Sequence, residues 1–107
     1  MNNIDLVQKI SILHCVFQTI ASADGAWDEV RDEEVLEFVL GKLGLNSYSY
    51  WDKALQMNVY DCFVHLAALD TLHKQLFAEL LMSVAQMGGN TVFRVNCAKH
   101  ILQLSNC

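Results

Sequence analysis

The chain has 107 residues, which is enough for one domain with one hydrophobic core and too few for two. Hydrophobic residues make up 53% and charged residues 18%, so some apolar surface is expected to remain for self-association or a protein partner. The net charge is −5 and the seven Lys and Arg residues are scattered, which argues against nucleic acid, because phosphate binding requires a basic patch. We therefore expect one domain, residues 1–107, that contacts protein.

The sequence also bears on location. It holds no run of about 18 apolar residues, so no membrane span is predicted. Residues 1–5 lack a basic segment followed by a cleavable apolar one, so no signal peptide is predicted. Four cysteines lie mostly within apolar helical patterns, at positions 15, 62, 97 and 107. Reduced, buried thiols and a cytoplasmic location are therefore expected.

The first half of the chain predicts two long helices. Apolar residues recur at spacings of three and four from residue 4 to residue 22, and the stripe is wide enough for a central helix buried on more than one side. A second helix is predicted from Asp32 to Leu43, because its acidic first turn complements the helix dipole. Gly44 is well placed to cap its C-terminus.

Four more helical segments are predicted. Asn46 opens a short helix that ends near Met57, and Asn58 caps the next one. Asp70 or Thr71 caps a fifth helix, which Gly88 and Gly89 stop. Asn90 starts the last segment, whose apolar face consists of Phe93, Cys97, Ile101 and Leu104. Because proline is absent and no strand-like alternation occurs, the prediction is an all-α fold of five to six helices.

An internal repeat relates the two ends of the chain. Residues 20–25 compare with residues 84–89, and residues 34–40 compare with residues 96–102. The two halves, roughly 4–44 and 70–105, would be helix–turn–helix units related by approximate two-fold symmetry, which would bring both corners toward a shared centre. In the second unit Gly88 stands at the position of Asp24, and Asn96 stands at the position of Glu34.

The corner between the first two helices is the main candidate site. Gly25 suits a helix end, because the residue after a helix often adopts positive φ. Asp24 is less expected there, since a helix C-terminus presents orphan carbonyls and partial negative charge. Carbonyl and carboxylate oxygens that converge on one place are the ligands that Ca²⁺ or Mg²⁺ prefers. The alternative is an ordinary Asp-Gly turn followed by the usual acidic start of a helix.

The motif Ala-x-Ala-Asp-Gly, followed by an acidic loop and a helix-opening glutamate, resembles the tellurite-resistance TerB-like family. That family includes the N-terminal region of a membrane-anchored J-domain co-chaperone. The resemblance implies a two-repeat helical fold whose paired acidic corners hold a divalent cation. The matching residues here are Asp24 and Glu34, or Glu33 given the longer loop, with Asn96 as an oxygen donor from the second corner. Because Gly88 and Asn96 replace the acidic residues of that corner, the resemblance implies weak or lost metal binding.

Two other metal sites are less favoured. An EF-hand loop starting at Asp24 would place Ala26, Glu29 and Val35 where the loop requires an oxygen ligand, a glycine and a glutamate. Zinc could bind the pairs Cys62-x-x-His65 and Cys97-x-x-His100, although both cysteines lie in apolar stripes and are more simply explained as buried.

No catalytic motif is present, and an enzyme is not expected. The aromatic residues Tyr48, Tyr50 and Trp51 are interpreted as packing a short helix on the core, and Trp27 as a plug that fixes the acidic loop. The resulting hypothesis is a non-enzymatic TerB-like module that binds a divalent cation at Asp24 and Glu34 and contacts a protein partner. The alternative is a purely structural interaction or homodimerisation domain, with a degenerate corner that binds no metal.

Overall fold

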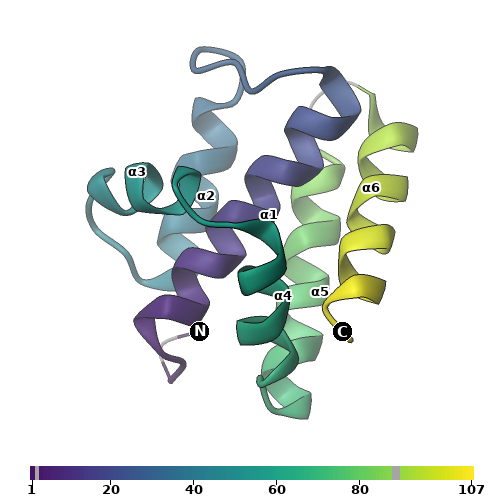
Figure 1. Cartoon of the computed structure of the whole chain (residues 1–107). Helices are drawn as coiled ribbons and strands as arrows, with labels where there is room; N and C mark the ends of the chain where they lie inside the picture. Colours follow the sequence, from purple (N-terminus) through teal and green to yellow (C-terminus); the bar gives the residue numbers. More distant parts are fainter. Residues whose placement is uncertain (2, 88–89) are drawn as a thin grey trace.

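The structure is a computed structural model that describes residues 1, 3–87 and 90–107, and these residues form six α-helices and no strand (Figure 1). The helices are α1 (Leu6–Asp24), α2 (Glu33–Leu43), α3 (Ser49–Leu55), α4 (Val59–Ala67), α5 (Thr71–Ala85) and α6 (Thr91–Leu104). The predicted all-α class is confirmed. The helix stop predicted at Gly88 and Gly89 lies outside the described residues.

Helix α1 is the centre of the bundle. It contacts α3, α4, α5 and α6, and in Figure 1 it crosses the middle of the molecule between α2 and α3 on one side and α5 and α6 on the other. Every residue from Ile10 to Val16 is buried, so α1 is enclosed on all its faces along that stretch. By length and composition alone α1 is also apolar enough to cross a membrane, a property that buried core helices share. The absence of a membrane span therefore stays a prediction.

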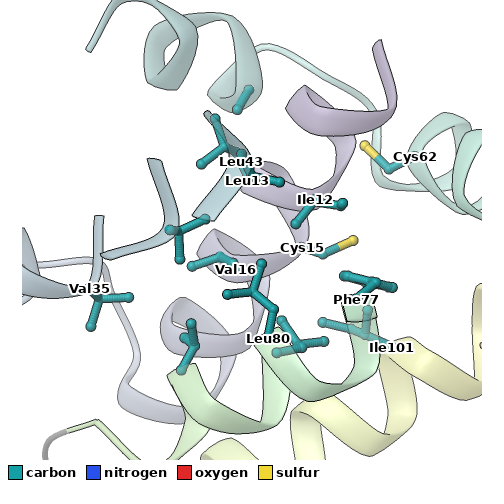
Figure 2. Packing of buried hydrophobic residues seen from close by; sticks show 14 of the residues in the cluster. Ile12, Leu13, Cys15, Val16, Val35, Leu43, Cys62, Phe77, Leu80 and Ile101 are labelled. Carbon is teal, nitrogen blue, oxygen red and sulfur yellow. The ribbon is translucent and has the colours of Figure 1, made fainter. Parts of the chain in front are cut away.

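The hydrophobic core forms where the other helices meet α1. Figure 2 shows side chains from α1, α2, α4, α5 and α6 packed together. The labelled residues are Ile12, Leu13, Cys15, Val16, Val35, Leu43, Cys62, Phe77, Leu80 and Ile101. Burial of such side chains contributes about 1.5–3 kcal/mol each, which makes this cluster the main source of stability.

Several helix ends follow the capping rules that the sequence predicts. The Asn58 side chain accepts a hydrogen bond from the Tyr60 backbone N–H at 2.8 Å, and the Asp70 side chain accepts one from the His73 backbone N–H at 2.8 Å. Gly44 follows α2 with φ of 69°, the left-handed conformation that glycine adopts most readily. These local contacts fix where α2, α4 and α5 begin or end.

The buried face of α6 differs from the predicted one. Arg94, Ala98 and Ile101 are buried, whereas Phe93 and Leu104 are 63% and 51% exposed. The physical reason is that Arg94 is held inside by carboxylates from the first half of the chain, which turns the predicted apolar stripe partly toward solvent. Helix α6 consequently presents apolar residues to solvent as well as to the core.

Candidate functional site

The candidate site begins where α1 ends. Asp24 is the last residue of α1, and Gly25 follows with φ of 87°, as its predicted role as a left-handed cap requires. The chain then turns through residues 25–32 and enters α2. The Asp24 side chain is only 3% exposed, so its carboxylate points into the molecule and needs a partner there.

Arg94 supplies that partner from α6. Its Nε donates to Asp24 Oδ2 at 3.0 Å, and its Nη2 donates to the same oxygen. Its Nη1 donates to the backbone carbonyl of Met87, and the Arg94 side chain is only 1% exposed. Asn90, just before α6, donates from Nδ2 to Asp24 Oδ1 at 3.0 Å. The two helical corners therefore meet through these contacts.

A second arginine–aspartate pair lies beside the first. Arg31 donates from Nε to Asp32 Oδ1 at 3.0 Å and from Nη2 to Asp32 Oδ2 at 2.7 Å, which is a bidentate pair. Arg31 Nη2 also donates to the Ala26 carbonyl at 2.9 Å and lies 3.5 Å from Asp24 Oδ2. Arg94 Nη2 lies 3.5 Å from Asp32 Oδ1, so the two pairs form one cluster. We call Asp24, Arg31, Asp32, Asn90 and Arg94 the corner network.

The charges of the corner network balance, because two carboxylates face two guanidinium groups. Hydrogen bonds from Arg94 are the main reason that the pKa of Asp24 is lowered. For Asp32, burial alone would raise the pKa, but hydrogen bonds from Arg31 and the Asp28 backbone, with the charges of both arginines, lower it overall. Both carboxylates are therefore held in their ionised form.

The predicted metal ligands do not all face one point. Asp24 lies in the corner network, whereas Glu33 and Glu34 are exposed in the first turn of α2. Asn96 lies on α6 and lines a groove shared with α4. Within residues 1, 3–87 and 90–107, no group of three or more His, Cys, Asp or Glu side chains is arranged to hold a metal ion. Gly88, expected at the second corner, lies outside the described residues.

Sequence reasoning missed Arg94. Its position did carry a signal, since it falls four residues before Ala98 and seven before Ile101, on the face of α6 that is buried. A charged residue on the inner face of a helix requires a buried partner of opposite charge. The motif Ala-x-Ala-Asp-Gly already contained that partner, Asp24. Asn90 was recognised as the start of α6 but not as a ligand of the carboxylate.

The second notable surface is a groove between α4 and α6, which we call the α4–α6 groove. Its lining includes Tyr60, Phe63, Asn96, Cys97, His100 and Leu104, and its volume is about 410 Å³. Cys97 is half-buried there instead of lying in the core, whereas Cys62 is fully buried with its thiol 3.9 Å from the Met57 sulfur. The two Cys-x-x-His pairs therefore lie in different environments.

Comparisons of the chain with protein-family models, curated proteins and solved structures gave no significant match. The fold and the corner network consequently define a class only, an all-α domain whose two helical corners are joined by buried arginine–aspartate pairs. The TerB-like assignment rests on the Asp24-Gly25 motif and the repeat, and it stays a prediction.

Proposed function

We propose that the chain is a non-enzymatic helical interaction domain of TerB-like type, in which Arg94 takes the role that a divalent cation has in that family. The single observation behind the proposal is the contact of the Arg94 guanidinium with the carboxylate of Asp24. This contact joins the end of α1 to the start of α6, so it ties the first corner of the chain to the second.

The chemistry of Asp24 supports arginine over a metal. Three N–H groups, two from Arg94 and one from Asn90, donate to its two oxygens. Ca²⁺ takes six to eight oxygen ligands and Mg²⁺ takes about six in octahedral geometry, and either ion would have to displace Arg94 from the carboxylate. Removing one partner from a buried ion pair costs about 3–5 kcal/mol, because it leaves the other charge buried without compensation.

Exposed apolar side chains support a role in protein contact. Tyr60 and Val64 on α4 are 72% and 70% exposed, and Phe93 and Leu104 on α6 are 63% and 51% exposed. Tyr60 and Leu104 lie in the α4–α6 groove. Exposed apolar side chains that lie close together are typical of protein interfaces. We propose that this surface is buried by a protein partner or a second copy of the chain.

The competing hypothesis is that a divalent cation binds at Asp24 with Glu34 or Glu33. Thermal unfolding distinguishes the two: the protein is unfolded in chelator and again, without chelator, in millimolar Ca²⁺, Mg²⁺ or Zn²⁺. The arginine proposal predicts that the unfolding temperature of the wild type stays the same within one degree or so. A ligand at about 100 times its dissociation constant adds about 2.7 kcal/mol, which would raise the unfolding temperature by several degrees.

The matched variant in this experiment is Asp24→Asn, which keeps the shape of the side chain and removes its charge. A cation-dependent rise in the wild type that Asp24→Asn abolishes would refute the proposal and establish the cation site. Stabilisation by Zn²⁺ alone would point instead to the Cys-x-x-His pairs and would also contradict the proposal that the domain works without metal.

A further inference from the structure

A third surface lies between the loop after α1 and the helices α2 and α3. It is a cavity of about 350 Å³, lined by Trp27, Leu36, Tyr48 and Trp51, with Glu29 and Glu33 among its polar residues. We call it the aromatic pocket. It is separate from the α4–α6 groove, and neither the fold nor the corner network accounts for its combination of aromatic and acidic side chains.

The aromatic side chains are held rigidly. The ring centroids of Trp27 and Trp51 are 4.4 Å apart with the rings tilted by 41°, and Trp51 also packs edge-on against Phe17 at 6.0 Å. Tyr48 is 52% exposed, and its hydroxyl donates to Glu37 Oε1 at 3.1 Å, which fixes the direction of the ring. Fixed aromatic rings lose little entropy on binding and present a negative face to a cation.

The corner network positions one of these rings. Arg31 Nη2 donates to the carbonyl of Ala26, the residue immediately before Trp27. Because Arg31 is itself held by Asp32, the loop that carries Trp27 is tied to the start of α2. The packing of Trp27 on Trp51 agrees with the prediction that Trp27 plugs the loop, and the same packing forms one side of the pocket.

The acidic residues give the pocket a negative charge without an internal counter-ion. In the part of the chain that the structure describes, neither Glu29 nor Glu33 forms an ion pair, although Arg31 and Arg94 both do. The pKa of Tyr48 is raised, chiefly by its hydrogen bond to Glu37, with a contribution from the charge of Glu33. The pocket thus combines aromatic rings with uncompensated carboxylates.

We infer that the aromatic pocket binds the ammonium group of a lysine side chain on a partner protein. A cation against Trp and Tyr rings gains about 0.5–2 kcal/mol, and the carboxylates of Glu29 and Glu33 favour the same charge. Charge complementarity also excludes an acidic partner at this surface, since Glu29 and Glu33 would repel it. The inference rests on the proposed function only in treating the chain as an interaction domain.

Tryptophan fluorescence tests the inference directly, because the two tryptophans of the chain, Trp27 and Trp51, both line the pocket. The full chain, in chelator, is titrated with a hexalysine peptide, with the same peptide acetylated on every Nε, and with choline. The inference predicts a saturable change in fluorescence with hexalysine and a response at least about tenfold weaker with the acetylated peptide, whose side chains carry no charge.

Two double variants with the same change in net charge serve as a matched pair. Glu29→Gln with Glu33→Gln removes the carboxylates of the pocket, and we expect it to weaken hexalysine binding about tenfold, which corresponds to about 1.4 kcal/mol. Glu34→Gln with Glu79→Gln removes two carboxylates that do not line the pocket, and it should change binding by less than about twofold if charge at the pocket decides affinity.

Three results would overturn the inference. The first is no fluorescence response to hexalysine, and the second is an equal weakening of hexalysine binding in both double variants. The third is a response to choline but not to the peptide, which would indicate a small quaternary amine as the ligand instead of a protein partner. Because the titration is done in chelator, its outcome does not depend on the cation experiment at Asp24. If hexalysine does not bind and the cations do not stabilise the wild type, the proposal of an interaction domain still holds and only the lysine partner is ruled out.

Discussion

Arg94 on α6 and Asp24 at the end of α1 are seventy residues apart in the chain, yet their side chains form a buried ion pair with Nε 3.0 Å from Oδ2. This pair joins the two helical corners at the place where the sequence predicts a cation site. Its consequences can be measured in stability, in pH dependence and in the geometry of the corner.

The corner network should make stability depend on pH in the acid range. The folded-state pKa values of Asp24 and Asp32 lie below the usual 3.8, so the unfolded chain binds more protons than the native protein as the pH falls toward 4. The contribution of these groups is therefore present above the unfolded pKa and is lost as the pH falls through the folded pKa. Urea unfolding at pH 7, 5, 4 and 3 should show this loss.

The control for pH dependence is a pair of aspartate variants. Asp24→Asn should lower stability at pH 7 and reduce the loss between pH 5 and pH 3, because the titrating group is gone. Asp61→Asn, which removes an exposed carboxylate on α4, should leave that loss in place. Identical pH profiles for the wild type and Asp24→Asn would contradict the role assigned to the pair.

The turn after α1 should be sensitive to a single methyl group. Gly25 has φ of 87° with no atom within 4 Å of an added Cβ, so Gly25→Ala tests backbone strain without a clash. The left-handed conformation should cost Gly25→Ala about 1–2 kcal/mol in the free energy of unfolding. Gly41→Ala, in α2 and also free of contacts, should instead gain about 0.5–1 kcal/mol. Urea midpoints that move in the same direction for both variants would argue against this geometry.

Substitutions on α6 should distinguish a buried position from an exposed one, although both side chains line the α4–α6 groove. Ile101→Ala removes a core side chain that is 6% exposed and should cost about 2–5 kcal/mol of stability. Leu104→Ser changes a half-exposed side chain of the α4–α6 groove and should alter stability by less than about 0.5 kcal/mol.

The same surface variant tests the proposed contact. Sedimentation velocity over a range of concentrations should show self-association of the wild type if a second copy covers the groove, and Leu104→Ser should weaken it. A wild type that stays monomeric at high concentration would exclude the second copy and leave only a different protein as the occupant. A large loss of stability in Leu104→Ser would show instead that this side chain belongs to the core.

Local signals in the sequence were sufficient for the fold class and for most helix ends. The three- and four-residue spacing predicted the central helix, and Asn58, Asp70 and Gly44 marked ends that the structure reproduces within a residue or two. Such signals work because capping and periodicity act between residues close in the chain. Gly25 was predictable for the same reason.

The partner of Asp24 was not predictable from local signals. An ion pair between residues 24 and 94 leaves no spacing pattern, and because buried arginines are rare, an arginine at position 94 is expected to face solvent. Of the predicted apolar face of Phe93, Cys97, Ile101 and Leu104, Ile101 is buried as predicted, whereas Phe93 and Leu104 are exposed and Cys97 is half-buried. The sequence singles out the corner at Asp24 as a candidate site, which stays a prediction, and the counter-charge of Asp24 lies on a distant helix.

The measurement that tests the central claim most directly is a double-mutant cycle in chelator with Arg94→Met, Asp24→Asn and the double variant, each unfolded in urea. If the two side chains hold the corners together, Arg94→Met alone should cost about 3–5 kcal/mol, because it leaves the Asp24 carboxylate buried without its main partner. The double variant should then lose less than the sum of the single losses, with a coupling of about 1–3 kcal/mol. Losses that add within about 0.5 kcal/mol would show that Arg94 and Asp24 act independently, and the claim that this pair joins the two corners would be wrong.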